Sequence, residues 1–362
     1  MKHVSELQKT LSYFLDWNKA RINCLVQILQ SLFYVRTVNL AQIAEAFQTT
    51  TKEESSYRRI QRFFKDFSFD TSSIVIMVLN LFVMNEKVTL IMDRTNWKWG
   101  GKHINILMLS VEYCGIGIPL FWEVLNSAGG SSTKNRIDLL EQVIKKVGLS
   151  RIKVLLADRE FIGEPWFRFL ITKNIPFVIR VKQNFMVEGV RIGYEVPLKE
   201  ILKKLNGRRK KLLNYPIVLW GHDLFVSIAH AQGAKEPMMV VSNRCFLSAL
   251  KIYRKRWGIE TLFGCLKSRG FRMEDTHMTE GSKIEKLVFI LAIAFCWAYK
   301  TGEIQALRVP IIIKKHGRRA KSVFRLGLNV IRSILLRPHQ QVEGLRFILS
   351  CFMSLISGGC SI

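Results

Sequence analysis

Short apolar runs rich in β-branched and aromatic residues follow one another from Val88 onward, and they constrain the fold more than any other feature of the sequence. The runs cover residues 88–92, 104–111, 118–125, 152–157 and 177–181, with a helical pattern over 137–147. The first three are joined by links too short for a helix, so we expect them to be antiparallel, and the helix-linked later runs to be parallel. The pattern predicts an α/β fold, a mixed sheet with helices on its faces.

The regions on either side of this core predict further parts. Apolar residues at three and four spacing predict a helical N-terminal domain, and probable strands at 215–220 and 223–229 among several glycines predict a β-rich insertion. We therefore expect an N-terminal helical DNA-binding domain (1–85), a first core segment (86–182), the insertion (183–245), a second core segment (246–282) and a helical C-terminal region (283–362).

The N-terminal region has the layout of a helix-turn-helix unit. Asn39 is expected to cap a short helix over 40–47, and a polar turn leads to a second helix over 55–67. Three cations line the side of that second helix opposite its apolar residues: Arg58, Arg62 and Lys65. This side is suited to DNA phosphates or a major groove, and a solvated basic face is the plain alternative.

The charge balance points to a polyanionic partner. The chain holds 55 Lys and Arg against 28 Asp and Glu, a formal net charge of +27, and nucleic acid is the default partner of such a chain.

Seven cysteines without zinc-type spacing predict free thiols in a reducing compartment. The N-terminus lacks an apolar signal core and the apolar stretch 287–299 is too short to span a bilayer, so we expect a cytoplasmic protein with no membrane partner.

Two aspartates stand where strand-like runs end. Asp93 follows the run over 89–92, and Asp158 follows the run over 154–157. Ligands bind at the ends of neighbouring strands in α/β sheets, and a carboxylate there can reach a metal ion, although a lone aspartate at a strand end often only caps a turn.

A third carboxylate lies far along the chain. Tyr253, Arg256, Glu260 and Lys267 fall within a sector of roughly 60° if residues 249–268 form one helix. With Asp93 and Asp158, Glu260 completes a set of hard oxygen ligands that suits two Mg²⁺ ions about 3.5–4 Å apart for attack on a phosphodiester. On the same face, Arg256 and Lys267 are expected to bind phosphate oxygens and Tyr253 to donate a hydrogen bond to one.

These sequence motifs resemble those of a known family. The spacing Tyr-x2-Arg-x3-Glu-x6-Lys from Tyr253 to Lys267 resembles the signature of a branch of bacterial insertion-sequence DDE transposases. The segment 93–97 (DRTNW) resembles that family's first catalytic motif and the segment 158–163 (DREFIG) its second. The likeness spans about residues 88–280, with a helical head and tail that fit.

The resemblance implies an RNase H-like catalytic core interrupted by a β insertion, for which the separation of 102 positions between Asp158 and Glu260 leaves room. It implies an enzyme whose catalytic and metal-binding residues are Asp93, Asp158 and Glu260, with two Mg²⁺ ions or Mn²⁺ as a substitute. It further implies cut-and-paste transposition through a DNA hairpin. The partners implied are double-stranded DNA, as the element's terminal inverted repeats and target DNA, and a second copy of the chain in a synaptic dimer near the nucleoid.

Hairpin formation in this branch is associated with a base that is flipped out and stacked on an aromatic residue. Trp220, in the insertion, is the candidate, and Trp97 and Trp99 beside Asp93 are rivals. A core role for Trp220 is the plain alternative, because an insertion of this size needs aromatic residues inside it.

Two other functions stay open at the level of sequence. A structure-directed nuclease on the same fold needs the three carboxylates but not Tyr253, Arg256 and Lys267 in that order. A DNA-binding relative that has lost catalysis would keep the basic surfaces while its carboxylates do nothing.

Overall fold

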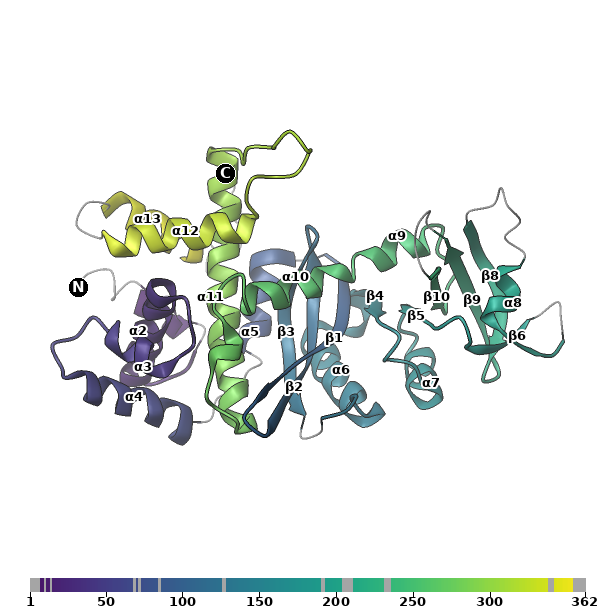
Figure 1. Ribbon diagram of the computed structural model, residues 1–362, viewed down its shortest axis with the longest axis horizontal. Coiled ribbons are helices and arrows are strands. Elements are labelled where there is room, and N and C mark those ends of the chain that lie inside the picture. The colour runs from purple at the N-terminus through teal and green to yellow at the C-terminus, as the bar shows by residue number, and fades with distance from the viewer. Residues whose placement is uncertain are drawn as a thin grey trace. The chain divides into compact units, whose positions relative to one another are not determined.

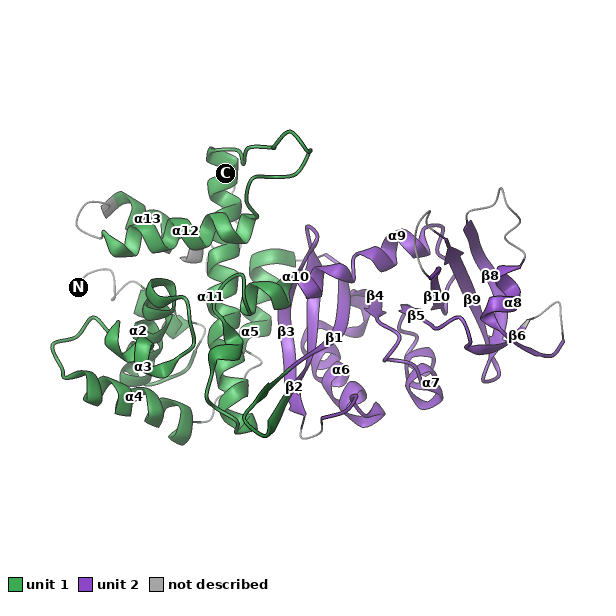
Figure 2. Cartoon of the chain, in the orientation of Figure 1, with its two compact units in different colours: residues 1–84, 97–104, 262–362 green, residues 85–96, 105–261 purple. Residues whose placement is uncertain are grey.

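The computed structural model describes residues 7–9, 11–13, 15–67, 70, 73–83, 86–125, 128–189, 193–203, 211–230, 236–337 and 342–353. The chain divides into two compact units (Figure 2): the first holds residues 1–84, 97–104 and 262–362, and the second holds residues 85–96 and 105–261. The N-terminal and C-terminal helical regions, which we expected to be separate parts, thus belong to one unit. The final residues of the expected C-terminal region, 354–362, lie outside the described residues.

The helices and strands follow the order shown in Figure 1. Unit 1 begins with α2 (Lys19–Val35), α3 (Leu40–Glu45), α4 (Glu53–Asp66), α5 (Ser73–Val78) and a π-helical turn (Leu79–Val83). The sheet and its helices follow as β1 (Val88–Trp99), β2 (Lys102–Tyr113), β3 (Ile116–Leu125), α6 (Thr133–Val147), β4 (Ile152–Ala157), α7 (Glu164–Thr172) and β5 (Phe177–Arg180). Then come β6 (Met186–Gly189), β7 (Glu195–Pro197), α8 (Leu198–Leu202), β8 (Lys211–Leu219), β9 (His222–Ala229) and β10 (Met238–Ser242). The chain closes with α9 (Ala249–Arg254), α10 (Trp257–Leu266), α11 (Gly281–Arg308), α12 (Val323–Leu336) and α13 (Val342–Met353).

The mixed sheet predicted from the apolar runs is confirmed. Its first five strands stand in the order β3-β2-β1-β4-β5, with β2 antiparallel to β3 and with β4 parallel to both β1 and β5. The described fold is a mixed α/β structure, as expected for an RNase H-like core. Strands β1 and β2 extend further than their apolar runs, to Trp99 at the end of β1 and from Lys102 at the start of β2.

The β-rich insertion adds its strands to the same sheet. Strand β10 pairs antiparallel with β5, and β9, β8, β6 and β7 follow outward to give ten strands in one order. Strands β8 and β9 confirm the two strands predicted at 215–220 and 223–229, although β8 ends at Leu219, and the two strands pair as a hairpin. Parts of the predicted insertion, residues 190–192, 204–210 and 231–235, lie outside the described residues.

Helix α11 forms the core of unit 1. Its indole Trp297 Nε1 donates to the carbonyl of Ile348 in α13 at 2.8 Å, and its ring meets Phe33 of α2 edge to face. The helix is 28 residues long and contains an apolar window of 18 residues, so α11 has the length and composition of a membrane span. The expectation that the apolar stretch 287–299 is too short to span a bilayer does not hold for the helix that contains it. Inside the protein, however, 83% of its most apolar window is buried, as in the core helix of a globular unit.

The helix-turn-helix layout is present in unit 1. Asn39 caps α3, its side-chain oxygen accepting from the backbone N–H groups of Ala41 and Gln42. Helix α4 begins at Glu53, two residues before the predicted start, because Glu53 and Glu54 favour the positive end of the helix dipole. Its apolar face buries Ile60, Phe63 and Phe64, as the spacing predicted.

The predicted single helix over 249–268 is wrong, because the chain turns at Lys255 and Arg256 between α9 and α10. The break lies beside a close approach of backbones. A Cβ atom on Gly258 would lie 2.9 Å from the carbonyl carbon of Ile116 and 3.0 Å from the backbone nitrogen of Gly117 in β3. A glycine is therefore required where α10 begins against the sheet.

This contact predicts a difference between two glycines of α10. We expect Gly258→Ala to lower the free energy of unfolding by about 1–3 kcal/mol, because two backbones must move apart. A Cβ on Gly264 meets only the flexible side chain of Arg269, at 3.2–3.3 Å, and helix propensity favours alanine by roughly 1 kcal/mol, so Gly264→Ala should be close to neutral or stabilising. Urea unfolding followed by circular dichroism checks both, and equal losses in the two variants would contradict the packing argument.

Candidate active site

Parallel pairing of β1 with β4 places two aspartates on neighbouring strands (Figure 1). Met92 of β1 stands opposite Ala157 of β4; Asp93 is the next residue of β1, and Asp158 is the first residue after β4. The sequence predicted that Asp93 ends its strand, but β1 continues to Trp99. Asp93 instead stands where the pairing of β1 with β4 ends. The two aspartates thus stand at the same end of the β1–β4 ladder.

Each aspartate accepts a hydrogen bond from the backbone of the residue after it. The N–H of Arg94 donates to Asp93 Oδ1 at 2.8 Å, and the N–H of Arg159 donates to Asp158 Oδ1 at 2.7 Å. These bonds fix the first oxygen of each carboxylate and leave the second for another partner.

Arg256 connects the aspartate of β1 to the glutamate of α10. From the turn between α9 and α10, its Nη1 donates to Asp93 Oδ2 at 2.7 Å and its Nη2 donates to Glu260 Oε1. The guanidinium is buried. Tyr253 of α9 completes the group, since its hydroxyl donates to Asp158 Oδ1 at 3.3 Å. Two hydrogen-bonded groups, Asp93–Arg256–Glu260 and Tyr253–Asp158, therefore meet in unit 2, where the Arg256 guanidinium carbon lies 5.8 Å from the centre of the Tyr253 ring.

Burial dominates the electrostatics of this site. It raises the pKa of Asp93 to about 6, against the opposing effect of the Arg256 charge, and the neighbouring negative charges of Glu160 and Asp158 raise it further. Burial also raises the pKa of the Tyr253 phenol, so this group stays protonated and acts as a hydrogen-bond donor to Asp158. The ionised form of a carboxylate whose pKa is raised in this way is stabilised by any cation brought beside it.

A second ion pair supports the aspartate strands, and sequence reasoning missed it. Arg94 binds Glu160 with two parallel bonds, Nε to Oε1 at 2.8 Å and Nη2 to Oε2 at 3.0 Å, and its Nη1 donates to Asn105 at 2.8 Å. Arg136 of α6 is buried and donates to the Glu160 carbonyl at 3.1 Å. Arg94 and Glu160 each stand within two residues of an aspartate, in the segments 93–97 and 158–163, and this proximity was the only indication of the pair in the sequence.

The site has the donor atoms that a hard divalent cation takes, but its carboxylates are shared with protein donors. Among the described residues, no three acidic, histidine or cysteine side chains are grouped closely enough to hold a metal ion. The physical reason is Arg256, whose two N–H groups stand between Asp93 and Glu260. Three carboxylates against one guanidinium still leave negative charge for a cation to neutralise, so the residues fit an ion by chemistry.

The sequence matches the transposase DDE domain family over residues 85–297, which is more than half of the chain. The chain belongs to the DDE transposase family. Its membership implies phosphodiester cleavage and transfer, and DDE transposases generally use divalent metal ions.

Other comparisons add less. A piggyBac transposase, solved by cryo-EM as a synaptic complex with hairpin DNA, aligns with a TM-score of 0.43 and 13% identity over 97% of this chain and 82% of that chain. The comparison with curated proteins found no match.

Lys267 of the transposase signature lies beyond the end of α10, in unit 1. Its ammonium nitrogen is 2.7 Å from Glu274 Oε1 and 5.8 Å from the centre of the Trp97 ring. The structure thus gives Lys267 protein partners, and its expected contact with a phosphate stays a prediction.

Trp220 of the transposase lies in the tight turn of the β8–β9 hairpin. Leu219 pairs with His222, so Trp220 and Gly221 alone form the turn, and both have positive φ angles, 50° and 74°. A tryptophan with positive φ is uncommon. The edges of its ring system meet Phe167 and Phe185, while 37% of the residue stays exposed. Both its packing role and its expected stacking role are compatible with this position.

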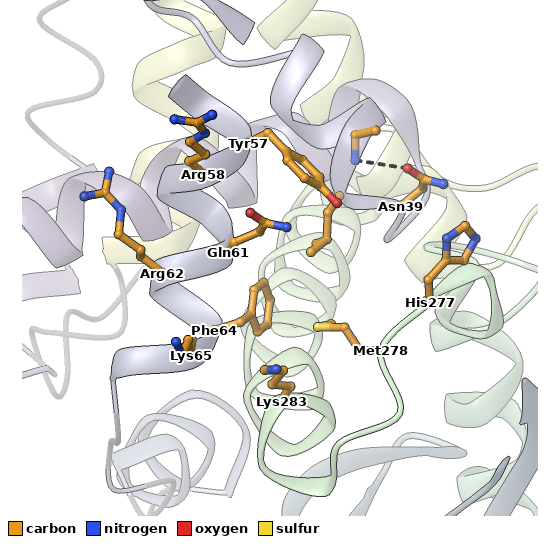
Figure 3. A pocket seen from close by; sticks show the side chains of 12 residues that line it. Asn39, Tyr57, Arg58, Gln61, Arg62, Phe64, Lys65, His277, Met278 and Lys283 are labelled. Carbon is orange, nitrogen blue, oxygen red and sulfur yellow. Dashed lines mark hydrogen bonds between the residues drawn. The ribbon is translucent and has the colours of Figure 1, made fainter. Parts of the chain in front are cut away.

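The three cations predicted to contact DNA line α4. Arg58, Arg62 and Lys65 are exposed, and Figure 3 shows Arg58 and Arg62 on one side of the helix while Tyr57, Gln61 and Phe64 point to the other. Their contact with DNA stays a prediction for this transposase.

The raised pKa of Asp93 predicts how stability depends on pH. In the unfolded chain the group titrates near 3.9, so its contribution to stability is complete below about pH 4 and is lost as pH rises through about 6. We expect the free energy of unfolding of Asp93→Asn, relative to wild type, to increase between pH 4 and pH 7 in EDTA. Urea unfolding measures this, with Asp138→Asn on α6 as the partly exposed control. A relative stability that does not change with pH would contradict the assignment.

Proposed function

We propose that this DDE transposase performs metal-dependent cut-and-paste transposition of an insertion sequence, with Asp93, Asp158 and Glu260 as its catalytic and metal-binding residues. The observation that supports this most directly is the parallel β1–β4 pair, which brings Asp93 beside Asp158, while Arg256 joins Asp93 to Glu260. Two Mg²⁺ ions, or Mn²⁺ in their place, would supply activation of the attacking oxygen and stabilisation of the leaving oxygen.

The chain's own residues have distinct tasks in this proposal. The carboxylates hold the cations, and the backbone N–H groups of Arg94 and Arg159 keep two of the carboxylates oriented. Arg256 has the planar fork that binds two oxygens at once, here from two carboxylates, and the same fork suits a phosphate. Tyr253 stays protonated and hydrogen-bonded to Asp158, and Lys267 adds a charge for DNA.

The DNA steps are taken from the family likeness. Water attacks at the element's ends, the freed 3′-hydroxyl attacks the opposite strand to give a hairpin, and the reopened ends join target DNA. The substrates are the terminal inverted repeats and the target duplex, bound in part by Arg58, Arg62 and Lys65 of α4. A homodimer that holds two ends, in the bacterial cytoplasm at the nucleoid, completes the proposal.

One observation favours an alternative. Because Asp93 and Glu260 are both paired with Arg256, a DNA-binding relative that does not cleave is the second candidate. A nuclease on the same fold would cleave without joining ends. Incubating the protein with Mg²⁺ and a labelled fragment of the element's own flank separates these functions: hairpin and joined products indicate transposition, nicks alone indicate a nuclease, and intact bound DNA indicates the inactive relative.

Substitution of the carboxylates tests their assignment. Asp93→Asn, Asp158→Asn and Glu260→Gln should each reduce Mg²⁺-dependent cleavage at least about 100-fold, because each removes an ion ligand. DNA binding should change little, since the basic surface is kept. Asp138→Asn, on α6, is the control and should cleave like wild type. Cleavage retained by any of the three variants would remove that residue from the catalytic set.

Substitution of Trp220 tests base stacking. In Trp220→Ala, the first nick should persist while hairpin product falls about 5- to 150-fold, the equivalent of the roughly 1–3 kcal/mol of a stacked base. Trp220→Tyr keeps an aromatic ring at the same positive-φ position and should retain hairpin formation. If Trp99→Ala rather than Trp220→Ala removes the hairpin, the stacking role belongs to Trp99.

A further inference from the structure

A cavity of about 870 Å³ opens beside α4 in unit 1. One wall is α4, and the other is the start of α3 together with residues of the 277–283 segment, where α11 begins (Figure 3). The size lies within the roughly 300–1,000 Å³ of cavities that hold small-molecule ligands. It is the size of a site for one small group rather than a groove for a duplex.

Buried contacts fix both walls in place. On the α4 side, the Lys286 ammonium of α11 is buried and donates to the carbonyl of Phe64 at 2.6 Å, which anchors the last turn of α4. On the opposite side, His277 stacks on Trp99 with ring centres 4.2 Å apart and planes 11° apart. The cavity is therefore preformed, which lowers the entropy cost of binding.

Polar groups point into this cavity from α4. Figure 3 shows Tyr57 and Gln61 on the side of α4 that faces the segment of His277 and Met278, and all four residues line the cavity. Within the described part of the chain, neither the Tyr57 hydroxyl nor the Gln61 amide makes a hydrogen bond. The ring of Phe64 and the thioether of Met278 line the cavity between them. Flat apolar surface with a hydrogen-bonding amide suits a heterocyclic base.

Positive charge surrounds the cavity. Lys65 and Lys283 line it together with Arg58 and Arg62, and the described lining contains no acidic residue. Lys283 has one acidic neighbour, Glu280, at 2.7 Å, so part of its charge is neutralised. The remaining charge calls for an anionic ligand, and a phosphate attached to a base has both properties.

We propose that this cavity binds one unpaired nucleotide of DNA, with its base between Tyr57 and Met278, its edge on Gln61 and its phosphates on Lys65 and Lys283. The inference rests on the proposed transposase function, which brings DNA to the protein. It names a nucleotide site separate from the carboxylate site and from Trp220. A glutamine amide pairs its donor and acceptor with adenine, so adenine is the favoured base.

The direction of the side chains separates this site from the duplex surface of the same helix. Tyr57 and Gln61 face the rest of the cavity lining, whereas Arg58 and Arg62, which also border the cavity, direct their guanidinium groups away from them. One helix thus offers two edges, an outer edge for the phosphates of a duplex and an inner edge for a single nucleotide.

Fluorescence anisotropy with the full-length protein tests the site. The probes are a labelled oligodeoxyadenylate, the matching oligodeoxythymidylate and a blunt duplex. Tyr57→Ala should weaken oligodeoxyadenylate binding about 5- to 150-fold, the equivalent of roughly 1–3 kcal/mol for a stacked base, and Tyr57→Phe should retain it. Gln61→Ala should abolish the preference for oligodeoxyadenylate over oligodeoxythymidylate. Duplex affinity should stay within about twofold in these variants, because the phosphate contacts are kept. Gln42→Ala, on the exposed side of α3, is the matched control.

Several results would overturn the inference. These are a wild-type protein that does not bind oligodeoxyadenylate, a Tyr57→Ala variant that binds it as Gln42→Ala does, and equal losses on single strand and duplex. Melting curves confirm that the variants are folded. The proposed function fails in a different way: the protein would bind single strands but would not cleave DNA. If the protein cleaves DNA but the Tyr57 and Gln61 variants bind oligodeoxyadenylate like wild type, the nucleotide site alone is overturned.

Discussion

The bond pair from Arg256 to Asp93 and Glu260 is the interaction on which the site depends. Burying a carboxylate without a partner costs several kcal/mol, and Asp93 is only 15% exposed. A guanidinium meets this cost with two fixed donors, and it has to stand outside a regular helix to reach a strand and a helix at once. The turn at Lys255 and Arg256 provides that position. The broken helix is therefore a requirement of the charge arrangement.

Two glycines, Gly117 of β3 and Gly258 of α10, let the backbones of the strand and the helix approach closely enough for this arrangement. Gly258 touches the backbone at Gly117, and a Cβ on Gly117 would in turn lie 3.1 Å from the Cα of Ile259. With side chains at both positions, α10 would stand further from the sheet and Glu260 further from Asp93. Packing without side chains thus sets the distance that Arg256 has to cover.

Periodicity and local chemistry specify the parts of the structure that could be predicted from the sequence. The strands, the cap at Asn39 and the position of Asp93 beside Asp158 were predictable, because apolar runs and short links determine them. The break before α10 was not, since apolar spacing continues through residues 255 and 256 and no proline marks it. The partners of Arg256 and Lys267 were not predictable either, because helical spacing gives a shared face but not the neighbours of that face. The Arg94–Glu160 pair joins residues 66 positions apart, which a single sequence does not reveal.

Charge acts in opposite senses at long and short range in this protein. A net charge of +27 attracts DNA from a distance, although salt limits that attraction to about 8 Å at physiological ionic strength. At the carboxylate site the local charge is reversed, since Asp93, Asp158 and Glu260 face one Arg256. A phosphodiester brought to this site meets net repulsion from the carboxylates until cations neutralise them. Under the proposed function, the basic surfaces bind DNA while the acidic site needs added cations for chemistry, so the two properties separate in experiment.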